Sequence, residues 1–169
     1  YDILCMTDDV DEFAVRMLAT YMEKTFKSVS DADLNLVSDE EKRAQERAEE
    51  ENKDMLAALK TALSGKVKNV RLSDRLKSSP VCLTSDGPLS IEMEKVLASM
   101  PSYDGSVKAE RVLEINPTHP VFEAIAKIPA DDARIGKYAV LLYDQALLIE
   151  GLPIDDPVAF SNAVCELMV

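Results

Sequence analysis

The sequence contains a single histidine, His119, and this limits the catalytic chemistry that its residues can support. A metal centre built on several histidines is excluded, and no serine lies in the G-x-S-x-G pattern of an activated nucleophile. No G-x-x-x-x-G-K-[ST] or G-x-G-x-x-G pattern is present to cradle phosphate. His119 instead precedes Pro120 and an apolar run from Val121, so we predict that it caps a helix there. These patterns predict no catalytic, cofactor-binding or metal-binding residue.

Acidic side chains and cysteines are the other groups that could bind metals or react. Acidic residues outnumber basic ones by 31 to 19, and the net charge of −12 repels phosphate backbones, so no nucleic-acid partner is expected. The carboxylates of residues 39–54 follow no calcium-loop pattern and indicate a solvated helix face. Cys5, Cys82 and Cys165 are odd in number and far apart, which predicts reduced thiols rather than disulfides or a zinc site.

The composition, 47% apolar and 30% charged over 169 residues, is that of one large or two small globular domains. Apolar runs such as residues 139–143 are far too short to span a membrane, so no membrane partner is expected. We see no export leader and expect a cytoplasmic protein. The sequence opens on a strand-like run at residues 1–6 without an initiator methionine, which suggests a piece of a longer protein.

The periodicities predict an α+β fold: a small α/β subdomain, then a three-stranded sheet with helices and a C-terminal helical hairpin. Strands are expected at residues 1–6, 26–29, 67–72, 80–84 and 111–115, and helices at 10–21, 38–64, 89–100, 121–128, 137–150 and 157–169. The helix at 38–64 is long and highly charged, which is typical of a solvated helix that connects two domains. We therefore predict domains at residues 1–37 and 38–169, the second comprising that helix, a sheet and helix region at 65–128, and the hairpin at 137–169.

The predicted helix at 137–150 is apolar on almost every side, so it needs neighbours on every side. Two interpretations remain open. The helix can be the core of a single domain, or it can pair with the helix at 157–169 as a hairpin that joins its twofold mate in a four-helix bundle.

The helix after Pro88 carries an apolar stripe with polar residues opposite and Ile91 off the stripe. Its members, at positions i, i+4, i+7, i+8 and i+11, are Leu89, Met93, Val96, Leu97 and Met100. Such a stripe ordinarily faces the core of its own domain. The alternative is an exposed, methionine-bearing surface for varied apolar partners.

Several segments resemble the heat shock protein 90 family, above all its bacterial HtpG members, in the family's order and at about its spacing. The segments are residues 1–12, 67–76, 80–81, 113–120, 144–151 and 156–157. The Leu-Glu-Ile-Asn-Pro-Thr-His-Pro string at 113–120 is the most specific, and the acidic stretch at 39–54 the least. The resemblance covers essentially the whole chain.

The resemblance implies that residues 1–37 end the family's middle segment and that residues 38–169 form its C-terminal dimerisation domain. It implies that the terminal hairpin forms the four-helix bundle of a homodimer, through Tyr138, Leu141, Leu142, Gln145, Leu148, Ile149, Phe160, Val164, Leu167 and Met168. The helix at 89–100 corresponds to the family's client-facing helix, which makes Leu89, Met93, Val96, Leu97 and Met100 the expected contacts for partly folded client proteins.

The function that this implies is a role in protein folding, unfolded-protein binding and the stress response. The family's ATP site lies in an N-terminal domain, so this chain alone is expected not to be an enzyme and to hold no cofactor, ATP and magnesium belonging to the full-length protein. The acidic tail that docks helical-repeat cochaperones in eukaryotic members is not found in this sequence. The alternative is an acidic structural adaptor that binds one partner through the 89–100 stripe.

Overall fold

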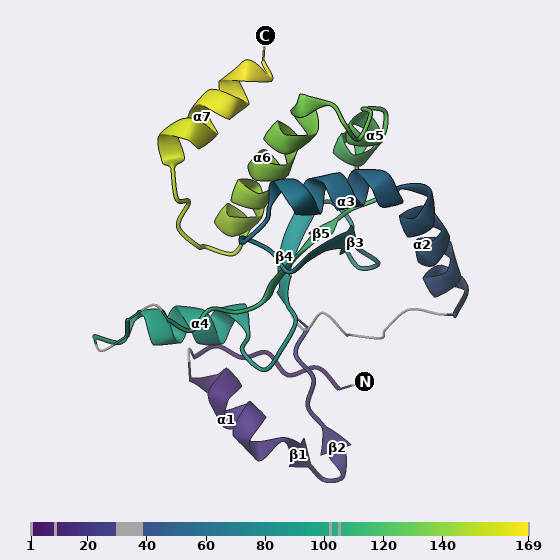
Figure 1. Ribbon diagram of the computed structural model, residues 1–169. Coiled ribbons are helices and arrows are strands. Elements are labelled where there is room, and N and C mark those ends of the chain that lie inside the picture. The colour runs from purple at the N-terminus through teal and green to yellow at the C-terminus, as the bar shows by residue number, and fades with distance from the viewer. Residues whose placement is uncertain (1, 9, 30–38, 102, 105, 169) are drawn as a thin grey trace. The chain divides into compact units, whose positions relative to one another are not determined.

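The computed structural model describes residues 2–8, 10–29, 39–101, 103–104 and 106–168 (Figure 1). The chain divides into two compact units, one made of Tyr1–Leu34 with Ser85–Glu110 and the other of Asn35–Thr84 with Arg111–Val169. Seven helices and two small sheets lie in the described residues, which confirms the predicted α+β class. No helix among these residues is long and apolar enough to cross a membrane.

The second unit is built on the three predicted strands, β3 (Asn69–Leu72), β4 (Val81–Ser85) and β5 (Arg111–Ile115), in the order β3-β5-β4. β3 runs parallel to β5, with Val70 opposite Leu113 and Leu72 opposite Ile115. These four side chains are at most 5% exposed. Because side chains alternate along a strand, they share one apolar face, and Arg71, Cys82 and Glu114 lie on the other.

Two helices form the core of this unit with the sheet. Helix α3 (Lys53–Ala62) packs against β3 and against α6 (Ala133–Ile149), as Figure 1 shows. Four side chains at the centre of this core are fully buried: Leu59, Leu63, Ala139 and Ala146. Helix α5 (Pro120–Ala126) begins as predicted, with the Nδ1 atom of His119 accepting a hydrogen bond from the Val121 N–H at 3.2 Å. The capping role of His119 is therefore confirmed.

The predicted charged helix at 38–64 is two helices rather than one. Helix α2 (Asp39–Glu51) ends before Asn52, whose φ of −111° and ψ of 17° are not helical, and α3 starts at Lys53. The Asn52 side chain donates a hydrogen bond to the Ala48 carbonyl at 2.8 Å. It thereby uses a carbonyl in the last turn of α2 that also serves the backbone of the helix. Asparagine competes with helical hydrogen bonds in this way, and this explains the break.

The first unit contains α1 (Asp11–Leu18), a hairpin of β1 (Thr20–Tyr21) and β2 (Lys24–Thr25), and α4 (Ile91–Ala98). Two strand predictions were wrong here, because residues 2–7 and 26–28 are not in strands. Met17 is 88% exposed, and no side chain of α1 is fully buried.

The predicted domain boundary near residue 37 lies outside the described residues, so the division into 1–37 and 38–169 stays a prediction. Ser85–Glu110 was assigned on the sequence to the second domain, and by its contacts it groups with the first unit.

A buried carboxylate organises the polar face of the three-stranded sheet. Glu114 is 1% exposed, and Arg75 Nη2 lies 3.0 Å and Arg71 Nε 3.1 Å from its Oε1 atom. The hydroxyls of Ser73 and Thr84 donate to the same carboxylate at 2.9 and 3.2 Å. Burial by itself raises the pKa of Glu114, but hydrogen bonds from Arg75 and Arg71 outweigh burial, and the pKa lies below its ordinary value.

Cys82 lies beside this carboxylate and should react far more slowly than the other two thiols. Burial, followed by the negative charge of Glu114, raises the pKa of Cys82 to about 12, whereas Cys5 and Cys165 are exposed. Because the thiolate is the nucleophile, a disulfide reagent at pH 8 should modify two thiols rapidly and the third only slowly. Denaturant should make all three react alike. Equally rapid modification of all three in the folded protein would contradict the partly buried position of Cys82 beside Glu114.

Candidate functional site

The terminal hairpin begins further upstream than predicted, because α6 starts at Ala133 and not at Lys137. Asp132 caps it, its Oδ1 atom accepting a hydrogen bond from the Arg134 N–H at 2.8 Å. Hydrogen bonds from the Arg134 side chain and backbone lower the pKa of Asp132 to about 2. The helix ends in a Schellman-type turn, in which Gly151 takes a φ of +69° and the Leu152 N–H bonds to the Leu147 carbonyl at 2.8 Å.

Helix α7 (Pro157–Glu166) follows after a short connection and packs against α6. Asp156 caps α7 by accepting hydrogen bonds from the backbone N–H groups of residues 158 and 159 at 3.1 and 2.9 Å. The Lys66 ammonium lies 2.9 Å from the Asp155 carboxylate and so ties the connection to the turn that follows α3. Proline is well suited to the first helical position. An N–H group at that position would have no partner within the helix, so proline loses no hydrogen bond by lacking one.

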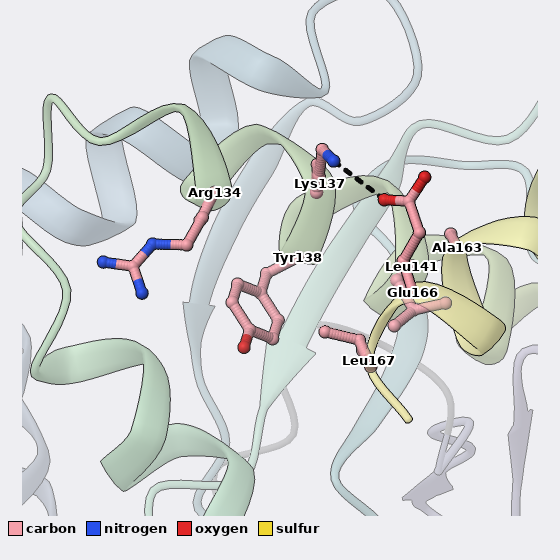
Figure 2. Close-up of a pocket in the computed structure, with 7 residues that line it drawn as sticks. All are labelled: Arg134, Lys137, Tyr138, Leu141, Ala163, Glu166 and Leu167. Carbon is pink, nitrogen blue, oxygen red and sulfur yellow. Dashed lines mark hydrogen bonds and ion pairs between the residues drawn. The ribbon is translucent and has the colours of Figure 1, made fainter. Parts of the chain in front are cut away.

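A pocket lies between α6 and α7 (Figure 2). Its apolar lining comes from Tyr138, Leu141, Ala163 and Leu167. The Lys137 ammonium and the Glu166 carboxylate, 2.8 Å apart, join the two helices at its rim, and Figure 2 shows Tyr138 and Leu167 extending towards each other. A pocket with this apolar lining can hold an apolar side chain from another protein surface.

The residues predicted for the dimer interface divide into two groups. Leu141 and Leu142 are 7% and 2% exposed, so they already belong to the core of this chain. The side chains of Leu148, Ile149, Leu167 and Met168 are 52%, 53%, 54% and 79% exposed. The remaining four are partly buried: Tyr138, Gln145, Phe160 and Val164. Val140 and Val158, which were not predicted as interface residues, are also exposed, at 40% and 70%.

The predicted client helix, α4, rests on α1 through a polar cluster. The Ser90 hydroxyl caps α4 by accepting from the Met93 N–H at 3.0 Å and donates to Glu12 at 2.8 Å. The Glu12 carboxylate also lies 3.0 Å from Arg16 Nε. The first turn of α4 is thereby held against α1.

The buried side of α4 is not its apolar stripe. Ile91, which is off the stripe, is 2% exposed, and Glu94, which was placed on the polar face, is 8% exposed. Glu94 accepts a hydrogen bond from the Ala109 N–H at 2.9 Å, and this partner accounts for a buried carboxylate. The stripe lies towards the surface: Met100 is 46% exposed, and the others, Leu89, Met93, Val96 and Leu97, are partly buried.

A helical hairpin with an exposed apolar surface, carried on a small α+β unit, is typical of a protein-binding module. Comparison with known families makes this specific, because residues 1–169 match the family described as Hsp90 protein. The chain belongs to the Hsp90 family.

Its relatives are bacterial chaperones. The chain is 54% identical over its whole length to Chaperone protein HtpG of Bacillus subtilis (strain 168). It is 57% identical, over 99% of its length, to Chaperone protein HtpG of Clostridium acetobutylicum. In both comparisons it spans 27% of the length of the relative. The resemblance seen in the sequence is thus confirmed for the family and for its HtpG members.

Two predictions are corrected by this match: that the chain is not an enzyme, and that it carries no cofactor. Both depended on placing the chain outside the ATP-binding part of the family's proteins. The match assigns all of residues 1–169 to the family and covers 27% of each relative, and it gives no ground for setting the chain apart from the nucleotide-binding part. We therefore withdraw both exclusions, of enzymatic activity and of bound ATP and magnesium.

Proposed function

We propose that this chain supplies the dimerisation and client-contact surfaces of an Hsp90-family chaperone that acts in protein folding and the stress response in the cytoplasm. Residues 1–37 then end the middle segment and residues 38–169 form the C-terminal domain. The observation that carries the proposal is the exposed apolar surface of the α6–α7 hairpin, with Leu148, Ile149 and Leu167 each more than half exposed. Leaving a leucine or isoleucine in water forgoes roughly 1.5–3 kcal/mol of burial.

A second copy of the chain is the proposed cover for this surface. In a twofold dimer the same hairpin faces itself, so two helices from each chain form a four-helix bundle. The pocket lined by Tyr138, Leu141 and Leu167 supports this arrangement, because it can receive an apolar side chain from the facing hairpin. Dimerisation would hold two chaperone chains together and raise the local concentration of one chain near the other.

Sedimentation velocity across a concentration series tests this proposal directly. We expect the chain to sediment as a dimer at micromolar concentration and to dissociate on dilution. A chain that remains monomeric at high micromolar concentration would contradict the proposed dimer, whatever its other activities.

The stripe of α4 is the proposed client contact, and it makes a separate prediction. Leu89→Ser with Val96→Ser should weaken binding to several unrelated unfolded proteins, measured by fluorescence anisotropy, with a small fall in melting temperature because both residues are only partly buried. Ile91→Ser is the matched control. Ile91 is 2% exposed, and its loss should lower the melting temperature sharply.

Two outcomes would oppose the client-contact role. A large stability loss in the double variant would place the stripe in the core. Tight binding to one partner, with no binding to unrelated unfolded chains, would favour the structural adaptor instead.

A further inference from the structure

We propose that the outer edge of β3 is a binding site for an extended segment of another polypeptide, and that α2 closes this site through Gln45 and Glu49. Neither the terminal hairpin nor the client helix uses this part of the molecule.

The outward-facing backbone groups of Leu72 carry this inference. In the described part of the chain β3 pairs only with β5, so its other side is a sheet edge. The next residue, Ser73, bonds inward, its N–H donating to the Ile115 carbonyl at 2.8 Å. The Leu72 N–H instead donates to Glu49 Oε1 at 3.0 Å, and its carbonyl accepts from Gln45 Nε2 at 2.7 Å.

Gln45 and Glu49 occupy the positions that a neighbouring strand would occupy. Four residues apart, they lie on the same face of α2. Together they present one acceptor and one donor to Leu72, as the peptide groups of a paired strand do. An incoming strand needs the same two Leu72 groups, so the strand and α2 exclude each other. The occupant must be a polypeptide in extended conformation, because its backbone repeats donor and acceptor at strand spacing.

The attachment of α2 allows it to move without disturbing the core. No described side chain of α2 is fully buried, whereas α3, which follows it, buries Met55, Leu56 and Leu59. The non-helical Asn52 separates the two helices and provides a hinge. Figure 1 shows α2 beside β3 and α3 across the sheet. Displacing α2 would therefore remove side-chain hydrogen bonds at the edge and leave the packing of α3 in place.

Gln45→Ala with Glu49→Ala tests the inference, with Glu46→Ala as the control. Glu46 is exposed on the same helix, and its loss changes the net charge by the same single unit. The probe is a fluorescein-labelled nonapeptide of alternating valine and threonine with a lysine at each end. We expect the double variant to bind it at least about tenfold more tightly than the native chain or Glu46→Ala. The amide of Leu72 should exchange with deuterium faster in the double variant and be protected again by the peptide.

A peptide methylated on alternate backbone nitrogens distinguishes strand pairing from apolar adhesion. It cannot form the ladder and should not bind. Equal binding of the methylated peptide, or equal affinity of the double variant and Glu46→Ala, would overturn the inference. If the double variant does not fold, Gln45→Ala alone should bind the peptide more tightly than the native chain. Glu49→Gln, which keeps an acceptor oxygen, should bind it as weakly as the native chain does, and the opposite result for either variant also overturns the inference.

Discussion

Glu114→Gln is expected to lower the free energy of unfolding by about 3 kcal/mol, the lower end of the range for breaking a buried ion pair. The substitution keeps the shape of the side chain and removes the charge that Arg71 and Arg75 share. Both guanidinium groups stay on the sheet face and lose the negative charge that they share, although the glutamine oxygen can still accept a hydrogen bond. The loss is not larger because their side chains are 31% and 26% exposed and keep some contact with water.

Urea unfolding followed by circular dichroism measures this effect. Glu123→Gln is the control, because it makes the same chemical change at an exposed glutamate of α5. It should leave the unfolding midpoint nearly unchanged. A midpoint for Glu114→Gln that matches the control would show that the cluster contributes little to stability.

The same carboxylate predicts a pH dependence with a definite sign. Its pKa in the folded chain lies below the ordinary value, so ionised Glu114 binds its partners only in the folded state. The stability that this supplies is fully present above the pKa of the unfolded carboxyl, about 4.3, and is lost as the pH falls through the lower folded pKa. The native chain should therefore lose more stability than Glu114→Gln as the pH is lowered from about 5, and the two should converge in acid.

Leu148→Ser with Leu167→Ser should convert the proposed dimer into a folded monomer. Both leucines are more than half exposed in the single chain, so serine costs the fold little. In a twofold interface each change occurs in both chains, and four apolar side chains are lost. Each leucine is already about half buried in the single chain, so the dimer would bury only the other half, about 0.75–1.5 kcal/mol for each side chain. Over four side chains the dissociation constant should therefore rise at least about a hundredfold. Sedimentation equilibrium gives this constant.

The control for this pair is Met17→Ser with Met22→Ser, which removes two apolar side chains that are 88% and 77% exposed in the first unit. It should leave dimerisation unchanged. Leu142→Ala separates the interface from the core in another way. Because Leu142 is 2% exposed, its truncation should cost about 2–5 kcal/mol of stability through a cavity within the chain. Unchanged dimerisation in the Leu148→Ser and Leu167→Ser variant would exclude this part of the hairpin as the contact.

Features that depend on neighbours along the chain were predictable from the sequence. The β-branched runs of β3, β4 and β5 form strands where expected, and His119 caps α5 beside the proline that follows it. These outcomes depend on side-chain alternation and on hydrogen bonds that span two or three residues. The predicted start of α6 at Lys137 was four residues too late, because the Asp132 cap and the burial of Ile135 carry the helix through Gly136, a residue that ordinarily disfavours helix.

Features that join distant segments were decided only by the tertiary structure. The partners of Glu114 come from Arg71, Arg75, Ser73 and Thr84, on segments that no periodicity relates to it. The clamp of Gln45 and Glu49 on Leu72 was hidden for the same reason within a helix interpreted as solvated. Membership of the Hsp90 family could be predicted from short sequence motifs. Leu142 and Leu148 lie in the same helix, which is apolar on almost every side, yet the first is buried and the second is exposed. This difference follows from packing in three dimensions, because only the fold decides which side of the helix is covered.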